Sequence, residues 1–163
     1  MSTATPNPTP SSPQAEFLSP RQVFERIQHI SLHRDAPVAD LYAPDGVHEW
    51  PFALPGVPRR LSGQDQIRAF FSRAAGAGRF EFHEFRDVVV HETADPEVII
   101  AEYDIHGQVK DADRTFVFSY ILVLRVRDGQ IVSLRDYLNP LAMADAADGE
   151  LLEGTEGTSD RSG

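Results

Sequence analysis

Four long segments of strand-forming residues follow one another through the second half of the chain, and they constrain the fold more than any other feature. They read FEFHEFRDVVVHET, EVIIAEYDIHGQV, RTFVFSYILVLRVR and QIVSLRDYL, and they lie between residues 80 and 138. Only the short sequences ADP, KDAD and DG separate them. Because short turns join antiparallel neighbours, the sequence predicts a sheet that is mainly an antiparallel meander.

The first helix is expected to begin at Ser19 and Pro20, a typical N-cap followed by proline at the first helical position. Apolar residues then recur at helical spacing, at positions 23, 24, 27 and 30. A short second helix is expected at PVADLY, residues 37–42. Asp45-Gly46 then turns the chain into a strand, GVHEWPF, residues 46–52.

A loop and another long helix are expected before the meander. The Pro- and Gly-rich sequence PFALPGVPRR, residues 51–60, predicts the loop. Ser62-Gly63 opens a helix over QDQIRAFFSRAA, residues 64–75, which carries an apolar stripe and ends at GAG. Everything after this helix is expected to be strand.

Helices followed by a curved sheet indicate an α+β domain, in which the helices cover one face of the sheet. We expect a cone-shaped α+β barrel with a cavity between helices and sheet. In TFVFSYILVL, residues 115–124, both alternating sets are largely apolar, so this strand needs cover on both faces. A second copy of the chain is the expected cover, which predicts a homodimer through the outer sheet face.

The 163 residues suit one domain with a substantial core. Residues 1–18 are rich in Pro, Ser and Thr, and residues 147–163 are polar and acidic, so both are expected to be disordered tails around a domain at 19–146. The N-terminus resembles no secretory signal, and a cytoplasmic location is expected. The chain has no cysteine, and its 25 acidic against 15 basic residues argue against nucleic-acid or membrane partners.

The last strand places a charge among apolar residues. Alternation puts Asp136 on one face with Val132, Leu134 and Leu138. A carboxylate in such surroundings has a raised pKa, which suits proton transfer near neutral pH. The alternative for Asp136 is a structural salt bridge with a neighbouring cation.

The sequences ADLYAPDGVHEWP, GQDQIRAFF and VRDGQIVSLRDYLNPL, in that order, resemble the nuclear transport factor 2-like superfamily and in particular its SnoaL-like members. ETADPEVIIAEYDIHGQV and DGQIVSLRDYLNP look most like the phenazine biosynthesis A/B branch. The resemblance covers residues 20–145. It implies the cone-shaped fold, whereas the reaction varies among superfamily members.

The resemblance does not carry over the catalytic residues of the ketosteroid isomerases in this superfamily, which use a tyrosine and two acids. The matching positions here are Arg26, Trp50 and Leu122. In limonene-type epoxide hydrolases, an Arg-x-Asp pair matches Glu102 and Asp104, so the arginine is missing.

Phenazine-branch proteins place a glutamate on the last strand, with a histidine and a serine on the helix before the sheet. The matching residues here are Asp136, Phe70 and Ala74. SnoaL-type cyclases use an aspartate from the sheet as acid and base, and the resemblance makes Asp136 its equivalent. A carboxylate on the last strand that points into the cavity is thus common to several branches.

Other candidates lie on the remaining strands. Glu102, Asp104 and His106 share one strand face, and the epoxide hydrolase resemblance implies that this face points into the cone. The alternative for Glu102 is a cross-strand pair with Arg125 or Arg135, and the alternative for His106 is a solvated side chain. Tyr120 can donate to a ligand or to a buried carboxylate. His48 and Trp50 alternate with Glu49 and are expected in the pocket unless a bulge inverts them. Arg59 and Arg60 are expected to be solvated.

The sequence therefore predicts a cofactor-independent enzyme of the SnoaL-like type that acts on a small hydrophobic metabolite. The expected chemistry is acid–base catalysis of cyclisation, isomerisation or condensation. The predicted catalytic residues are Asp136, Glu102, Asp104, His48 and Tyr120. The predicted binding residues are Trp50, Phe70, Phe118, Leu122 and Leu134, and no metal motif is evident. The alternatives are a dimeric binding module without catalysis and a water-adding hydrolase that uses Asp104 and Asp136.

Overall fold

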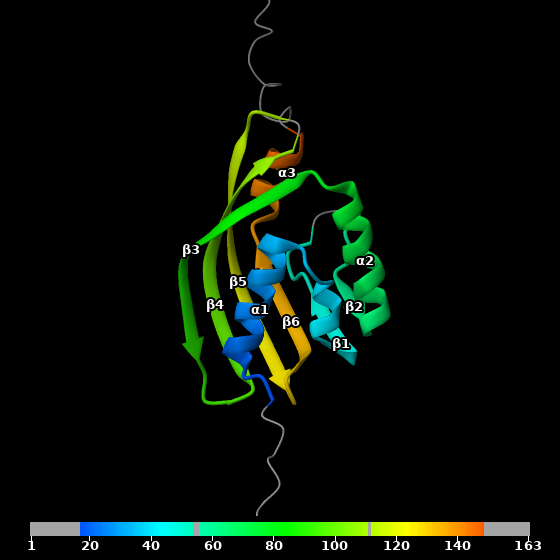
Figure 1. Ribbon diagram of the computed structural model, residues 1–163, viewed down its shortest axis with the longest axis vertical. Helices are drawn as coiled ribbons and strands as arrows, with labels where there is room; N and C mark the ends of the chain where they lie inside the picture. The colour runs from blue at the N-terminus through cyan, green and yellow to red at the C-terminus, as the bar shows by residue number, and fades with distance from the viewer. Residues whose placement is uncertain (1–16, 54–55, 111, 149–163) are drawn as a thin grey trace, which may run out of the picture.

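The computed structural model describes residues 17–53, 56–110 and 112–148 of the chain (Figure 1). The described residues form one six-stranded sheet with helices packed against it. The helical elements are α1 (Pro20–His33), the short 3-10 helix η1 (Val38–Leu41), α2 (Gln64–Ala77) and α3 (Pro140–Asp148). The strands are β1 (Tyr42–Glu49), β2 (Arg60–Ser62), β3 (Phe80–Glu92), β4 (Val98–Val109), β5 (Thr115–Arg127) and β6 (Gln130–Leu138). No helix in this part of the chain is long and apolar enough to cross a membrane.

The strand order across the sheet is β2-β1-β6-β5-β4-β3. The meander from β3 to β6 is antiparallel, as the short turns predict. β1, in contrast, pairs with β6 in parallel, and β2 adds a short antiparallel edge. Because of this parallel pairing, residues from the first third of the chain lie beside residues from the last strand.

Helices α1 and α2 lie on the same side of the sheet and close its inner face (Figure 1). The predicted stripe of α1 is confirmed, since Val23, Phe24, Ile27 and Ile30 are all buried. The Ser19 hydroxyl accepts a hydrogen bond from the Gln22 backbone N–H, and the Gln22 side chain accepts one from the Ser19 backbone N–H. The two bonds form a capping box at the start of α1. The result is the predicted cone-shaped α+β fold.

The start of β6 departs from simple alternation. Ile131 is fully buried, and so is Leu134, although three positions separate them. The β5–β6 register shifts between Arg125 and Val126, where a bulge resets the alternation. Strict alternation along β6 would put Ile131 and Leu134 on opposite faces, and the bulge is the physical reason that both are buried.

The end of the described chain is a helix, which corrects the prediction that everything after residue 75 is strand. The Asn139 side chain accepts a hydrogen bond from the Leu141 backbone, and Pro140 occupies the first helical position of α3. This is the same kind of signal as Ser19-Pro20. The two predicted tails lie outside the described residues, except for positions 17, 18, 147 and 148.

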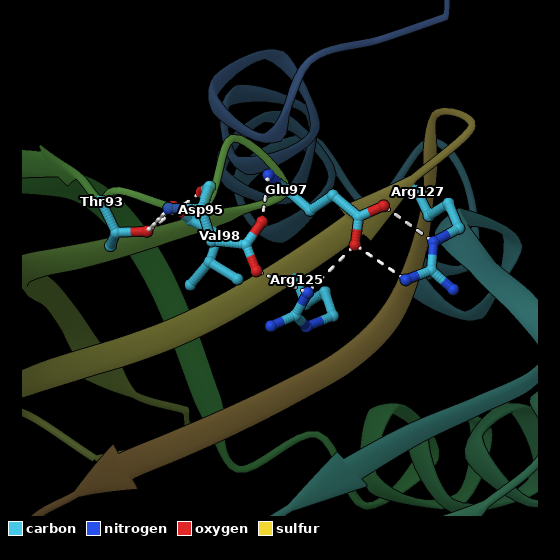
Figure 2. Close-up of polar contacts among 6 residues, drawn as sticks. All are labelled: Thr93, Asp95, Glu97, Val98, Arg125 and Arg127. Atoms are coloured by element: carbon cyan, nitrogen blue, oxygen red, sulfur yellow. Dashed lines mark hydrogen bonds and ion pairs between the residues drawn. The ribbon is translucent and has the colours of Figure 1, made fainter.

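An ion-pair network ties the β3–β4 turn to the end of β5 (Figure 2). Arg125 donates to Asp95 and Glu97 at 2.9 and 3.0 Å, and Arg127 donates twice to Glu97. The hydrogen bonds from Arg127 lower the pKa of Glu97 to about 2. The network is solvent-exposed, so its main effect is to set the orientation of the turn.

A glycine in β4 lets a backbone carbonyl and a phenyl ring pack close to the strand, and alanine there is expected to destabilise the protein. A Cβ atom on Gly107 would lie 2.2 Å from the Glu81 carbonyl oxygen and 2.5 Å from the Phe116 ring. We expect Gly107→Ala to lower the free energy of unfolding by about 2 kcal/mol or more, as measured by urea denaturation. Gly76→Ala in α2 is the control, because its Cβ meets nothing within 4 Å and should stabilise the helix slightly. Equal effects of the two substitutions would contradict this expectation.

Candidate functional site

Asp136 lies on β6 with its side chain on the inner face of the sheet. Its cross-strand partner is Leu122, and Leu134, two positions earlier, is buried on the same side. Because β1 runs parallel to β6 with His48 opposite Leu134, the side chains of His48 and the following Trp50 reach the carboxyl group. The structure thus places His48 and Trp50 inward and Glu49 outward.

Two ring nitrogens face one oxygen of the Asp136 carboxyl group. The Trp50 indole donates a hydrogen bond to Oδ2 at 3.2 Å, and Nε2 of His48 lies 3.9 Å from the same atom. The second oxygen, Oδ1, is buried without a hydrogen-bond partner among the described residues, and so is Nε2 of His48. Buried polar atoms without partners are rare and point to a site for a ligand or water.

Burial sets the protonation of Asp136. The side chain is 14% exposed, and loss of hydration raises its pKa from 3.8 to about 7, against the smaller opposing effect of the Trp50 hydrogen bond. Among the described residues no Lys or Arg pairs with this carboxyl group. The alternative of a structural salt bridge is therefore not what the structure contains.

A buried tyrosine determines which nitrogen of His48 carries the proton. The Tyr42 hydroxyl lies 2.7 Å from Nδ1 of His48. Burial raises the pKa of Tyr42 above its usual value and lowers that of His48 to about 3, so the phenol keeps its proton and the imidazole is neutral. Since Nδ1 is the one partner of this hydroxyl among the described residues, the hydroxyl donates and we assign the ring proton to Nε2. His48 then directs an N–H group at Asp136.

Aromatic rings cover this polar cluster. The Trp50 ring lies 4.0 Å from the His48 ring and 4.9 Å from that of Phe70, and Phe71 contacts His48 edge-on at 5.3 Å. The Tyr120 ring stacks on Tyr103 at 5.2 Å. Burial and the nearby Asp136 carboxyl raise the pKa of Tyr120, so its hydroxyl stays protonated.

A groove of about 630 Å³ lies beside Phe70, which forms part of its lining. Its lining is mostly apolar and comes from α2 and the segment before it. The lining residues are Gly56, Pro58, Leu61, Gln66, Ala69, Phe70, Arg73 and Ala74. Phe70 lines the groove and Trp50 bonds the carboxyl group, so these two contacting rings, tilted at 46°, lie between them.

The predicted binding residues fall into two groups, one at the groove and the carboxyl group and one in the packed core. Phe70 lines this groove, and Trp50 covers Asp136. Phe118, Leu122 and Leu134 are 0%, 3% and 4% exposed and lie in the packed core rather than along the groove. The interior beneath the helices is thus largely filled by side chains.

The prediction that Glu102, Asp104 and His106 point into the cone is wrong. On β4 the buried residues are Ile99, Ala101, Tyr103 and Ile105, so the alternate positions lie on the outer face. Glu102 contacts His91 at 2.7 Å rather than Arg125 or Arg135. The helices pack on the opposite side of β4, and this decides which alternating set is buried.

Sequence analysis did not identify Tyr42 and Phe71 as site residues. Tyr42 was expected at the end of a helix, whereas it begins β1 and is fully buried. The sequence feature that could have indicated its role is its position six residues before His48. The two side chains meet, however, only because β1 contains a bulge between them. Among the described residues, no cluster of three His, Asp or Glu side chains is arranged to hold a metal ion.

Residues 23–134 match the SnoaL-like domain family. The chain belongs to this family. It is 39% identical over 113 residues to an uncharacterized PhzA/B-like protein of Pseudomonas aeruginosa, covering 68% of this chain and 76% of the relative.

Solved structures agree with the fold described above. A Bacillus subtilis protein provisionally named an isomerase superposes with a TM-score of 0.73 at 29% identity, covering 82% of this chain and 95% of that one. A Pseudomonas putida protein provisionally named a polyketide cyclase gives a TM-score of 0.63 at 20% identity, with 79% and 98% coverage, and this likeness shows the fold alone. The matched residues include Tyr42, His48 and Trp50, whereas Asp136 lies two positions beyond them.

Replacement of Asp136 by asparagine is expected to stabilise the protein at high pH. The folded-state pKa of about 7 exceeds the ordinary 3.8, so the native state binds the extra proton and stability falls as pH rises through this window. The cost above pH 7 is up to about 4 kcal/mol, from roughly three units at about 1.4 kcal/mol each. Urea denaturation of Asp136→Asn should show this gain at pH 8 and little gain at pH 4.

The control is Asp45→Asn, which makes the same chemical change at an exposed position of β1. Because this side chain is exposed, its replacement should not reproduce the gain of Asp136→Asn at pH 8. A constant difference between Asp136→Asn and the unchanged protein across this range would contradict the assigned burial of the charge.

Proposed function

We propose that this protein is an acid–base enzyme that catalyses cyclisation, isomerisation or condensation of a small hydrophobic metabolite. The observation that supports it is the buried Asp136 carboxyl group, whose pKa of about 7 lets it both accept and donate a proton near neutral pH. Membership of the SnoaL-like family and the provisional names of its relatives are consistent with this chemistry.

The proposed roles follow from the contacts of the site. Asp136 removes or returns a proton through Oδ1, because Oδ2 is held by the Trp50 indole. His48 stays neutral and offers its Nε2–H to an oxygen that becomes negative during the reaction. Tyr42 is a positioning residue that holds the imidazole in this tautomer. The groove beside Phe70 receives the apolar body of the substrate, and the Trp50 ring moves to admit the reacting carbon to Asp136.

The hydrolase alternative needs Asp104 and Asp136 to act as a pair. The two side chains lie on opposite faces of the sheet, so they cannot contact one substrate atom together. We therefore do not carry this alternative further. A binding module without catalysis remains the competing outcome of the experiment below.

Proton–deuterium exchange tests the proposed base directly. In deuterated buffer, aromatic β-keto esters should exchange the proton between their carbonyl groups faster with the protein than without it, as followed by NMR. The rate should rise with pH through about 7, because the base must be ionised. Asp136→Asn should lose roughly a hundredfold of this rate, in line with typical general-base contributions.

Asp45→Asn, at an exposed position of β1, serves as the matched control and should keep the full rate. Binding of the esters without exchange or product would favour the binding module. Full exchange by Asp136→Asn would remove Asp136 from the mechanism.

We also propose that the protein is a homodimer through the outer face of the sheet. Val117 and Ile121 on β5 are 48% and 44% exposed, and Val89 on β3 is 49% exposed. Exposed apolar side chains grouped on one sheet face are typical of an interface.

Ile121→Arg should convert the dimer to a monomer in sedimentation velocity experiments, because it buries a charge in the proposed interface. Leu141→Arg is the control, since this residue is 74% exposed on α3, away from that face. A monomeric unchanged protein, or a dimer that survives Ile121→Arg, would contradict the proposed interface.

A further inference from the structure

A second pocket, of about 210 Å³, lies against Trp50 at the end of β1. We call it the arginine pocket, and its lining consists of Glu49, Trp50, Pro51, Arg59, Arg60 and Arg135. Its size suits a small functional group rather than a whole metabolite. Trp50 is common to this pocket and to the catalytic cluster, because its indole donates to Asp136.

The register of the sheet places the charges of this pocket. Glu49 on β1 pairs with Arg60 on β2 and with Arg135 on β6, so the two arginines flank it on neighbouring strands. Arg60 contacts the Glu49 carboxylate at 2.7 Å, and Arg135 lies 3.8 Å from it. The Arg135 guanidinium also lies 5.3 Å from the centre of the Tyr137 ring, which restricts its position. Two of the three cations are thus held by regular strands rather than by loops.

The charges in the pocket do not balance. Three arginines and one glutamate line it, and Arg59 forms no ion pair with any residue in the described ranges. The whole chain carries a formal charge of -10, so this positive group stands out against an acidic surface. A polyanion would be repelled by that surface, whereas a small anion feels mainly the local arginines.

We propose that the arginine pocket binds the carboxylate of an organic-acid substrate, with the rest of the molecule against Trp50. This rests on the proposed function in one respect, namely that the same molecule supplies the reacting carbon to Asp136. Arginine suits this task because its planar fork of N–H donors matches a carboxylate. The substrate class is then a hydrophobic ring or chain that bears one carboxylate.

Trp50 provides a direct readout of binding, because it is the one tryptophan of the chain. Its fluorescence can be titrated with cyclohexanecarboxylate, with neutral cyclohexanemethanol of the same shape, and with inorganic phosphate. We expect the carboxylate to bind at least about tenfold more tightly than the alcohol, as one charge-assisted contact provides. Added salt should weaken carboxylate binding and leave the alcohol unaffected.

Variants locate the site of binding. Arg59→Gln and Arg135→Gln should each weaken carboxylate binding about tenfold. Arg21→Gln is the matched control, since it removes the same charge from an exposed pair with Glu92 on another part of the surface. Glu49→Gln should tighten carboxylate binding several-fold, because it releases Arg60 and Arg135 from their internal partner.

Equal affinity for the carboxylate and the alcohol would overturn the proposal, as would equal effects of the Arg135 and Arg21 substitutions. Phosphate binding tighter than that of the carboxylate would overturn the assigned substrate class. None of these measurements requires turnover. If exchange fails and the carboxylate still binds at these arginines, the proposed catalysis is lost and the anion site stands.

Discussion

The parallel pairing of β1 with β6 is the constraint on which the candidate site depends. It brings Trp50 to Asp136, which lies 86 positions later in the chain, and sets His48 opposite Leu134. All other pairings in the sheet are antiparallel and join strands that are neighbours in sequence. Loss of this one pairing would therefore leave the meander nearly intact and dismantle the polar cluster.

The polar cluster of Asp136 and His48 lowers the stability of the fold, and this loss of stability is a reason to regard the cluster as functional. Oδ1 of Asp136 and Nε2 of His48 are both buried without partners among the described residues. An unsatisfied buried polar atom costs roughly 1–3 kcal/mol, and the residues around this pair are apolar or aromatic. A leucine at position 136 would pack against Leu122 and Leu134 at no such cost. The sequence accepts a local loss of stability at a position suited to proton transfer.

The sequence predicts much of the fold because its signals are local. The short turns between the last four strands and the Ser19-Pro20 helix start each act within a few residues, and both appear in the structure. The Asn139-Pro140 signal for α3 is equally local, and it has the same form as the Ser19-Pro20 helix start. The β1–β6 pairing joins distant segments, so no local pattern reveals it.

The candidate site is harder to predict because alternation gives two equivalent answers. On β4 the period of two separates Tyr103 from Glu102 and Asp104, but only the packing of the helices decides which set is buried. On β6 a bulge shifts the period after Ile131, while Asp136 keeps the expected face. The role of Tyr42 depends on a hydrogen bond that exists only once β1 is bulged.

The alternation of charge along β6 matters for the chemistry as well as for the fold. Arg135 and Asp136 are consecutive, so the sheet holds the guanidinium on one side and the carboxyl group on the other. A cation within about 4–6 Å would lower the pKa of Asp136 by one to three units and remove its proton near neutral pH. The Glu49 carboxylate holds Arg135 on the outer side and so helps to keep Asp136 away from it. A shift of one residue in this strand would exchange the two groups, which would neutralise the arginine pocket and ionise the buried acid.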